Sequence, residues 1–66
     1  MPTNGLDLRA ERRAANVTVV EIASRMGLSR QTVHTLERSA VITVVQAEQY
    51  RGALRDAIVA SNEKVA

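Results

Sequence analysis

The segment from Arg30 to Arg38 carries the side chains best suited to binding chemistry. At about 100° per residue, a helix over 30–39 turns Val33, Leu36 and Glu37 to one face. The opposite face then holds only hydrogen-bonding side chains, which are Gln31, His34, Thr35 and Arg38. Such a face can bind a polar or anionic partner, although ordinary solvated helices carry similar residues.

Two short helices joined by a tight turn are expected to position that face. The first is predicted over 18–26, where Thr18 and Glu21 fit the S/T-x-x-E capping box. Ser29 is the predicted cap of the second helix, over 30–39. This arrangement suits a protein that lays its second helix in the major groove of DNA.

The spacing of Ala23, Gly27 and Val33 is typical of a helix-turn-helix motif. Alanine allows the two helices to approach closely, and glycine adopts the positive φ that the turn needs. Apolar anchors complete the motif: Ile22, Met26, Leu28 and Leu36.

Further helices are predicted on both sides of the motif. A first helix is expected over 6–15, and Asn16 can end it in the left-handed conformation. A last helix is expected over 44–60. The valine-rich segment 41–45 has strong β propensity, so a short strand there is the alternative. Gly52 costs the last helix about 1 kcal/mol relative to alanine.

The 66 residues are enough for one small domain. We expect a flexible start over 1–5, a domain over 6–60 and a C-terminal tail over 61–66. The chain has no cysteine and one histidine, so no metal site or cofactor is expected. Its start lacks the pattern of a signal peptide and no segment approaches the roughly 20 apolar residues of a membrane span, so a cytoplasmic location without a membrane partner is expected.

The net charge is +2, and the whole excess lies within residues 1–38. A mild basic bias in the half that holds the motif is a weak sign of a polyanionic partner. The sequence offers no supported Ser-His-Asp or Cys-His set and no glycine-rich phosphate loop, so neither an enzyme nor a small-molecule ligand is expected.

The chain resembles the phage Cro and repressor family of helix-turn-helix DNA-binding proteins. The resemblance covers roughly residues 6–58. It is carried by Leu8-Arg9-x-x-Arg12 and by Val17-Thr18-x-x-Glu21-Ile22-Ala23-x-x-Met26-Gly27-Leu28-Ser29-Arg30-x-Thr32-Val33-x-x-Leu36-Glu37. It implies an all-α, lambda-repressor-like fold of four or five helices, in which the helix over 30–39 enters the major groove.

The resemblance also implies which residues contact bases. These are Arg30, Gln31 and Thr35, at the start and on the outer face of the second motif helix. Arginine suits guanine O6 and N7, glutamine suits adenine N6 and N7, and the threonine methyl group suits that of thymine.

Contacts to DNA phosphates are implied for a second set of residues, which fix the register of the protein without reading sequence. This set comprises Thr18, Val19, Ser29, Thr32 and Arg38. Many relatives have glutamine at the position of Val19, whereas valine can offer only its backbone N–H or a methyl contact.

Arg12 and Glu37 lie on the inward faces of their predicted helices, and the family pattern implies that they form an ion pair. Two pairs of apolar residues, Val19–Val20 and Val41–Ile42, occupy places that are often polar in relatives. They either cover a partner surface or are folded into the domain. Residues 41–58 are therefore the candidate homodimer contact. His34 is expected to be solvated and Tyr50 to be in the core.

The favoured interpretation is a small transcriptional regulator, a Cro-like protein or a minimal repressor, that binds double-stranded DNA. One alternative is a protein-interaction role on the same scaffold, as an antitoxin or an inhibitor of a host protein. Another is an excisionase-like architectural protein that bends DNA.

Overall fold

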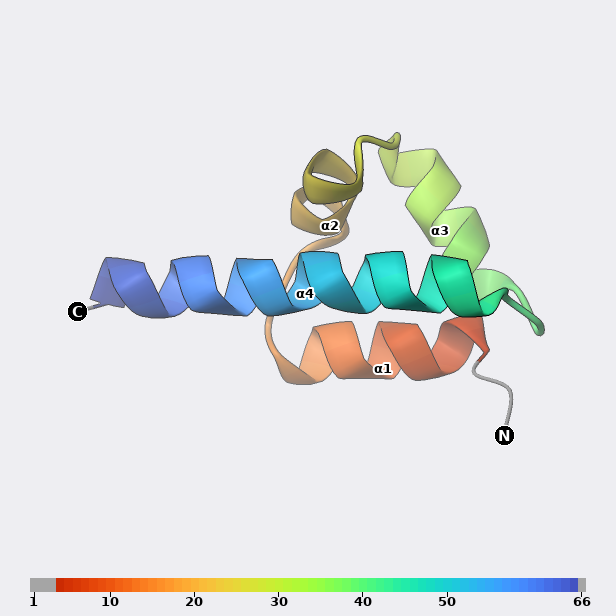
Figure 1. The fold of residues 1–66 in the computed structure, drawn as a ribbon, viewed down its shortest axis with the longest axis horizontal. Helices are drawn as coiled ribbons and strands as arrows, with labels where there is room; N and C mark the ends of the chain where they lie inside the picture. Colours follow the sequence, from red (N-terminus) through yellow and green to blue (C-terminus); the bar gives the residue numbers. More distant parts are fainter. Residues whose placement is uncertain (1–3, 66) are drawn as a thin grey trace.

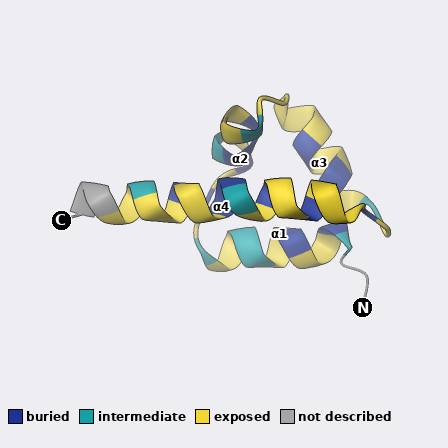
Figure 2. Cartoon of the chain, in the orientation of Figure 1, coloured by how far each residue is buried: buried dark blue, intermediate teal, exposed yellow. Residues whose placement is uncertain are grey.

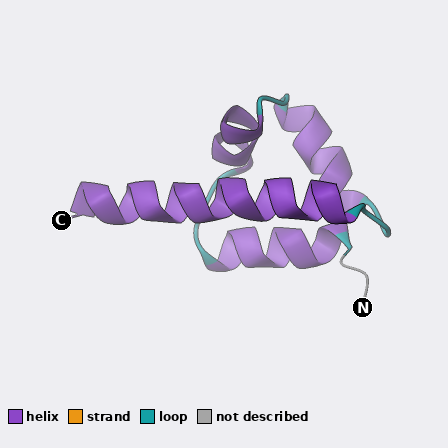
Figure 3. Cartoon of the chain, in the orientation of Figure 1, coloured by secondary structure: helices purple, strands orange, loops and turns teal. Residues whose placement is uncertain are grey.

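The computed structural model describes residues 4–65, and their side chains as far as residue 62. Within this part the chain forms four α-helices and no strand, which confirms an all-α domain (Figure 3). The helices are α1 (Gly5–Ala14), α2 (Val19–Met26), α3 (Arg30–Arg38) and α4 (Val44–Val65). No helix in this range is both long and apolar enough to cross a membrane.

Side-chain oxygens cap the first three helices. Asn4 Oδ1 accepts from the N–H of Asp7 at 2.9 Å, and Thr18 Oγ1 accepts from the N–H of Glu21 at 3.2 Å. Ser29 Oγ accepts from the N–H of Thr32 at 3.1 Å. The predicted capping box at Thr18 is half formed, because the Glu21 carboxylate instead accepts from an arginine four residues later, at 3.4 Å.

A complete capping box starts α4. The N–H of Gln46 donates to Thr43 Oγ1 at 3.0 Å, and the N–H of Thr43 donates to Gln46 Oε1 at 2.9 Å. This reciprocal pair commits Val44 and Val45 to the helix, so the alternative of a strand over 41–45 is wrong.

The predicted helix ends are mostly close to those observed. Asn16 and Gly27 adopt the left-handed conformation, with φ of 59° and 71°, as expected. The last helix runs to Val65, past its expected end near residue 60, so the predicted tail is helical as far as 65. In the predicted flexible start, Asn4 caps α1 and Gly5 is its first residue, whereas residues 1–3 and 66 lie outside the described part.

The helices enclose one core. In Figure 1, α1 and α4 run alongside each other in the same direction, and α2 and α3 lie on one side of them. Helix α2 packs against α3 and α4, and α1 packs against the same two helices. The buried faces meet between the helices (Figure 2). The most deeply buried side chains are Leu8, Ile22, Val33, Glu37, Tyr50 and Ala57.

Two of the four apolar residues at positions that are often polar in relatives lie in the core, and two lie at the surface. Val19 and Ile42 are buried, at 9% and 8% exposure, so the domain folds them in. Val20 and Val41 are exposed. Leu28 was expected to anchor the motif, but it is 41% exposed because the turn between α2 and α3 holds it at the surface.

Candidate nucleic-acid interface

The outward face of α3 forms the candidate site. Val33, Leu36 and Glu37 are buried against the rest of the domain, which fixes how the helix is rotated. Five exposed side chains on the other side line an open hollow of about 410 Å³, and these are Arg30, Gln31, His34, Thr35 and Arg38. The polar face predicted from the sequence periodicity is therefore confirmed as an exposed surface.

All three predicted base-contacting residues line this hollow. Arg30 and Gln31 are exposed in the first turn of α3. Thr35 Oγ1 donates to the backbone carbonyl of Gln31 at 3.0 Å, so its hydroxyl proton is already used within the helix. Thr35 can still offer its methyl group and an acceptor lone pair.

The predicted phosphate-contacting residues are more scattered. Of them, only Arg38 lines the hollow on α3. Thr18 and Ser29 are exposed caps at the starts of α2 and α3. Thr32 lies on another flank of α3, where its Oγ1 is 2.8 Å from Ser29 Oγ and where it lines a hollow of about 470 Å³ with residues of α2 and α4.

The burial of Val19 corrects part of the prediction that this residue contacts DNA phosphates. Its side chain is buried in the core, so a contact between its methyl groups and DNA is excluded. Its backbone N–H is the first of α2, and the first N–H groups of a helix have no acceptor within the helix. Only this backbone group of Val19 is suited to a phosphate.

Two arginines of α3 have no carboxylate partner among the described residues. Among the described residues, the ion pairs use Arg12, Arg25 and Arg51. Arg30 and Arg38 form none, and both are exposed in the hollow on α3. Their positive charge is available to an anionic partner.

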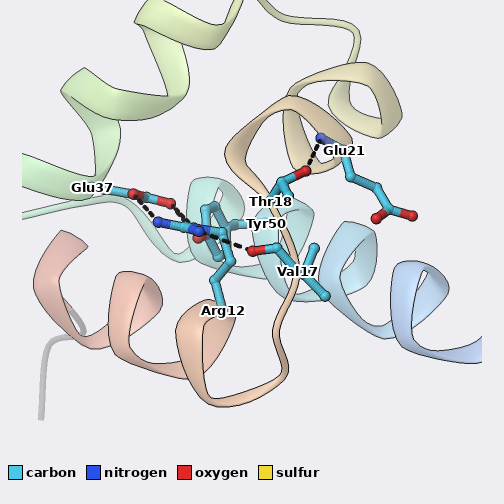
Figure 4. A network of polar contacts seen from close by, with 6 residues as sticks. All are labelled: Arg12, Val17, Thr18, Glu21, Glu37 and Tyr50. Carbon is cyan, nitrogen blue, oxygen red and sulfur yellow. Dashed lines mark hydrogen bonds and ion pairs between the residues drawn. The ribbon is translucent and has the colours of Figure 1, made fainter. Parts of the chain in front are cut away.

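A buried polar network holds α3 in place (Figure 4). The guanidinium of Arg12 donates to both carboxylate oxygens of Glu37, at 2.8 and 3.2 Å, which confirms the predicted ion pair. Arg12 Nη1 also donates to the carbonyl of Val17, at 2.9 Å. Glu37 is 2% exposed. Its Oε2 atom also accepts a second hydrogen bond, from a residue of α4.

Tyr50 of α4 is the third member of the network, and the sequence analysis placed it in the core without assigning it a partner. Its hydroxyl donates to Glu37 Oε2 at 2.5 Å. A buried tyrosine hydroxyl requires a partner, and Glu37 was the one charged residue predicted on an inward face of α3. That combination was the available signal for the contact.

The network shifts the pKa values of its members. Burial is the main cause that raises the pKa of Tyr50, and the hydrogen bond to Glu37 raises it further. The hydrogen bond to Glu37 raises the pKa of Arg12. Arg12 therefore stays charged and Tyr50 stays neutral, so one positive and one negative charge balance within the network.

The chain was compared with protein-family models, with curated proteins and with solved structures. None of the three comparisons found a match.

Proposed function

We propose that the chain is a sequence-specific DNA-binding regulator of the Cro and repressor kind, which inserts α3 into the major groove. The observation that carries the proposal is the outward face of α3, where Arg30, Gln31, Thr35 and Arg38 line one hollow and the two arginines form no ion pair with a described residue. B-DNA has a major groove about 12 Å wide, which admits an α-helix.

The residues divide into two roles in this proposal. Arg30, Gln31 and Thr35 contact base edges and supply specificity. Phosphates are bound by Arg38, by the exposed hydroxyls at the helix starts and by the backbone N–H of Val19, which together fix the register.

We also propose that two copies act together. Homodimers of such domains bind half-sites about 34 Å apart, one turn of the DNA helix. The longest dimension of the domain is 37 Å, so two adjacent copies can span that distance. Within the predicted contact over 41–58, Val41, Val44 and Val45 are 77%, 74% and 61% exposed. Exposed apolar side chains that lie close together favour burial against a partner, so these three valines support a contact between copies.

Selection of bound sequences from random DNA at fixed salt tests the proposal. Enrichment of a defined site is expected. Arg30→Ala and Gln31→Ala should then relax specificity at separate base positions, at a cost of about 1–3 kcal/mol each. Arg55→Ala is the matched control, because Arg55 is exposed on α4 and lines none of the hollows around α3.

The salt dependence of binding distinguishes this proposal from a protein-interaction role. The exposed valines at the start of α4 are the observation that favours that second candidate. DNA binding weakens steeply with salt through counterion release, whereas an apolar protein contact shows little salt dependence. No enrichment at low salt would overturn the DNA-binding proposal.

A further inference from the structure

A second, smaller hollow lies between α1 and α3, beside the face described above. Its volume is about 170 Å³, and it is lined by Arg9, Arg12, His34, Glu37 and Arg38. His34 and Arg38 also line the hollow on α3, so the two hollows adjoin at these residues. Arg9 does not line the first hollow, and it brings a residue of α1 to the edge of the candidate interface.

The floor of this hollow is electrically balanced and its rim is positive. Glu37 accepts two hydrogen bonds from Arg12 and one from Tyr50, and it is 2% exposed. Its negative charge is therefore already compensated. Arg9 and Arg38 are exposed and form no ion pair within the described residues, which leaves the lining with a net charge of +2 when His34 is neutral.

The charges of α1 are segregated in a way that keeps Arg9 unpaired. Glu11 accepts two hydrogen bonds from Arg51 of α4, at 2.8 and 3.2 Å. Asp7 lies one turn before Glu11 and contributes to the same electrostatic environment of Arg51. The acidic flank of α1 therefore faces α4, whereas Arg9 lies about 160° away from Glu11 around the helix, on the flank beside α3.

We propose that this hollow binds one phosphate of the DNA backbone, with Arg9 and Arg38 as its two cationic ligands. The inference rests on the proposed DNA-binding function and adds a contact from α1 that the sequence did not indicate. Guanidinium groups bind phosphate oxygens through paired, charge-assisted hydrogen bonds. The Arg12–Glu37 pair holds the wall between the two helices. Arg12 donates two hydrogen bonds to Glu37 and one to the carbonyl of Val17, so its charge is already paired and Arg9 and Arg38 supply the unpaired charge.

Salt titrations of DNA binding by the full chain test the site. We expect Arg9→Gln to weaken binding to the selected sequence and to unrelated duplex DNA by the same factor, roughly five- to tenfold at 0.1 M salt. The slope of log K against log salt should fall in magnitude by about 0.9, the loss of one phosphate contact. Base preferences should not change, unlike those of Arg30→Ala.

Two variants serve as controls. Arg55→Gln removes the same charge from an exposed position on α4 that forms no ion pair within the described part of the chain, and it should leave the slope nearly unchanged. Arg9→Lys keeps the charge, so it should retain the slope while losing part of the affinity. Both Arg9 variants should melt like the parent chain, because the Arg9 side chain is exposed.

The outcomes separate the two proposals. If the parent chain binds DNA and Arg9→Gln behaves like Arg55→Gln, the phosphate site is overturned and the DNA-binding function stands. If the parent chain enriches no sequence and shows no salt-dependent binding to duplex DNA, both proposals are overturned.

Discussion

Glu37 accepts hydrogen bonds from two other helices, although it is a buried carboxylate of a small domain. Removal of one partner from a buried ion pair leaves the other charge uncompensated, at a cost of about 3–5 kcal/mol. We therefore expect Glu37→Ala to lower the melting temperature by more than roughly 10 °C, since a domain of this size loses about 4–8 °C per kcal/mol. Thermal unfolding followed by circular dichroism measures the change, and an unaltered melting temperature contradicts it.

The raised pKa of Tyr50 predicts how the free energy of unfolding changes at alkaline pH. Its pKa is raised above the ordinary value of 10.0, so the folded chain keeps the phenolic proton where the unfolded chain releases it. Its contribution to stability is complete below pH 10 and is lost as the pH rises through the folded-state pKa. The free energy of unfolding in urea should fall more between pH 9 and 11 for the parent chain than for Tyr50→Phe. Equal falls would show that Tyr50 does not cause the effect.

At the scale of elements, two glycines should respond to the same substitution with opposite signs. A Cβ on Gly5 comes 2.1 Å from the carbonyl oxygen of Leu36, so α1 and α3 must separate. A Cβ on Gly52 meets nothing within 4 Å. Urea unfolding should show Gly5→Ala destabilised by about 1–3 kcal/mol and Gly52→Ala stabilised by about 1 kcal/mol. The same sign for both would refute the packing argument.

The elements that the sequence predicts best are those with local signals. The caps at Thr18 and Ser29 and the left-handed residues Asn16 and Gly27 depend on neighbours within four positions, and each is present. The strand alternative over 41–45 failed because β propensity was outweighed by a capping box that uses the side chain of Gln46.

Most features that depend on the crossing of distant helices could not be predicted from the residues, and the Arg12–Glu37 pair was expected only through the family pattern. The polar face of α3 follows from periodicity, but the approach of Arg9 to His34 and Arg38 depends on how α1 packs against α3. The close contact of Gly5 with α3 has the same origin. A sequence pattern describes the face of one helix and does not give the distance between two.

At the scale of the whole molecule, α4 extends past the other helices at its C-terminal end (Figure 1). Its exposed start carries the proposed contact between copies. Sedimentation at tens of micromolar should show a dimer, and Val41→Glu with Val45→Glu should shift it to a monomer. Because both side chains are mostly exposed, the double variant should keep its fold. A monomeric parent chain would refute the dimer.

The network around Glu37 also affects the thermodynamics of association. It joins α3 to α1 and α4, and the N–H of Gly5 donates to the carbonyl of Ser39, just beyond α3, at 2.8 Å. These contacts hold the outward face of α3 in one position in the folded chain, so we expect the proposed DNA binding to involve no coupled folding. Preorganisation of this kind lowers the conformational entropy lost on binding. Calorimetry should accordingly give a heat-capacity change that matches the contact area alone, without the larger negative value of a segment that folds as it binds.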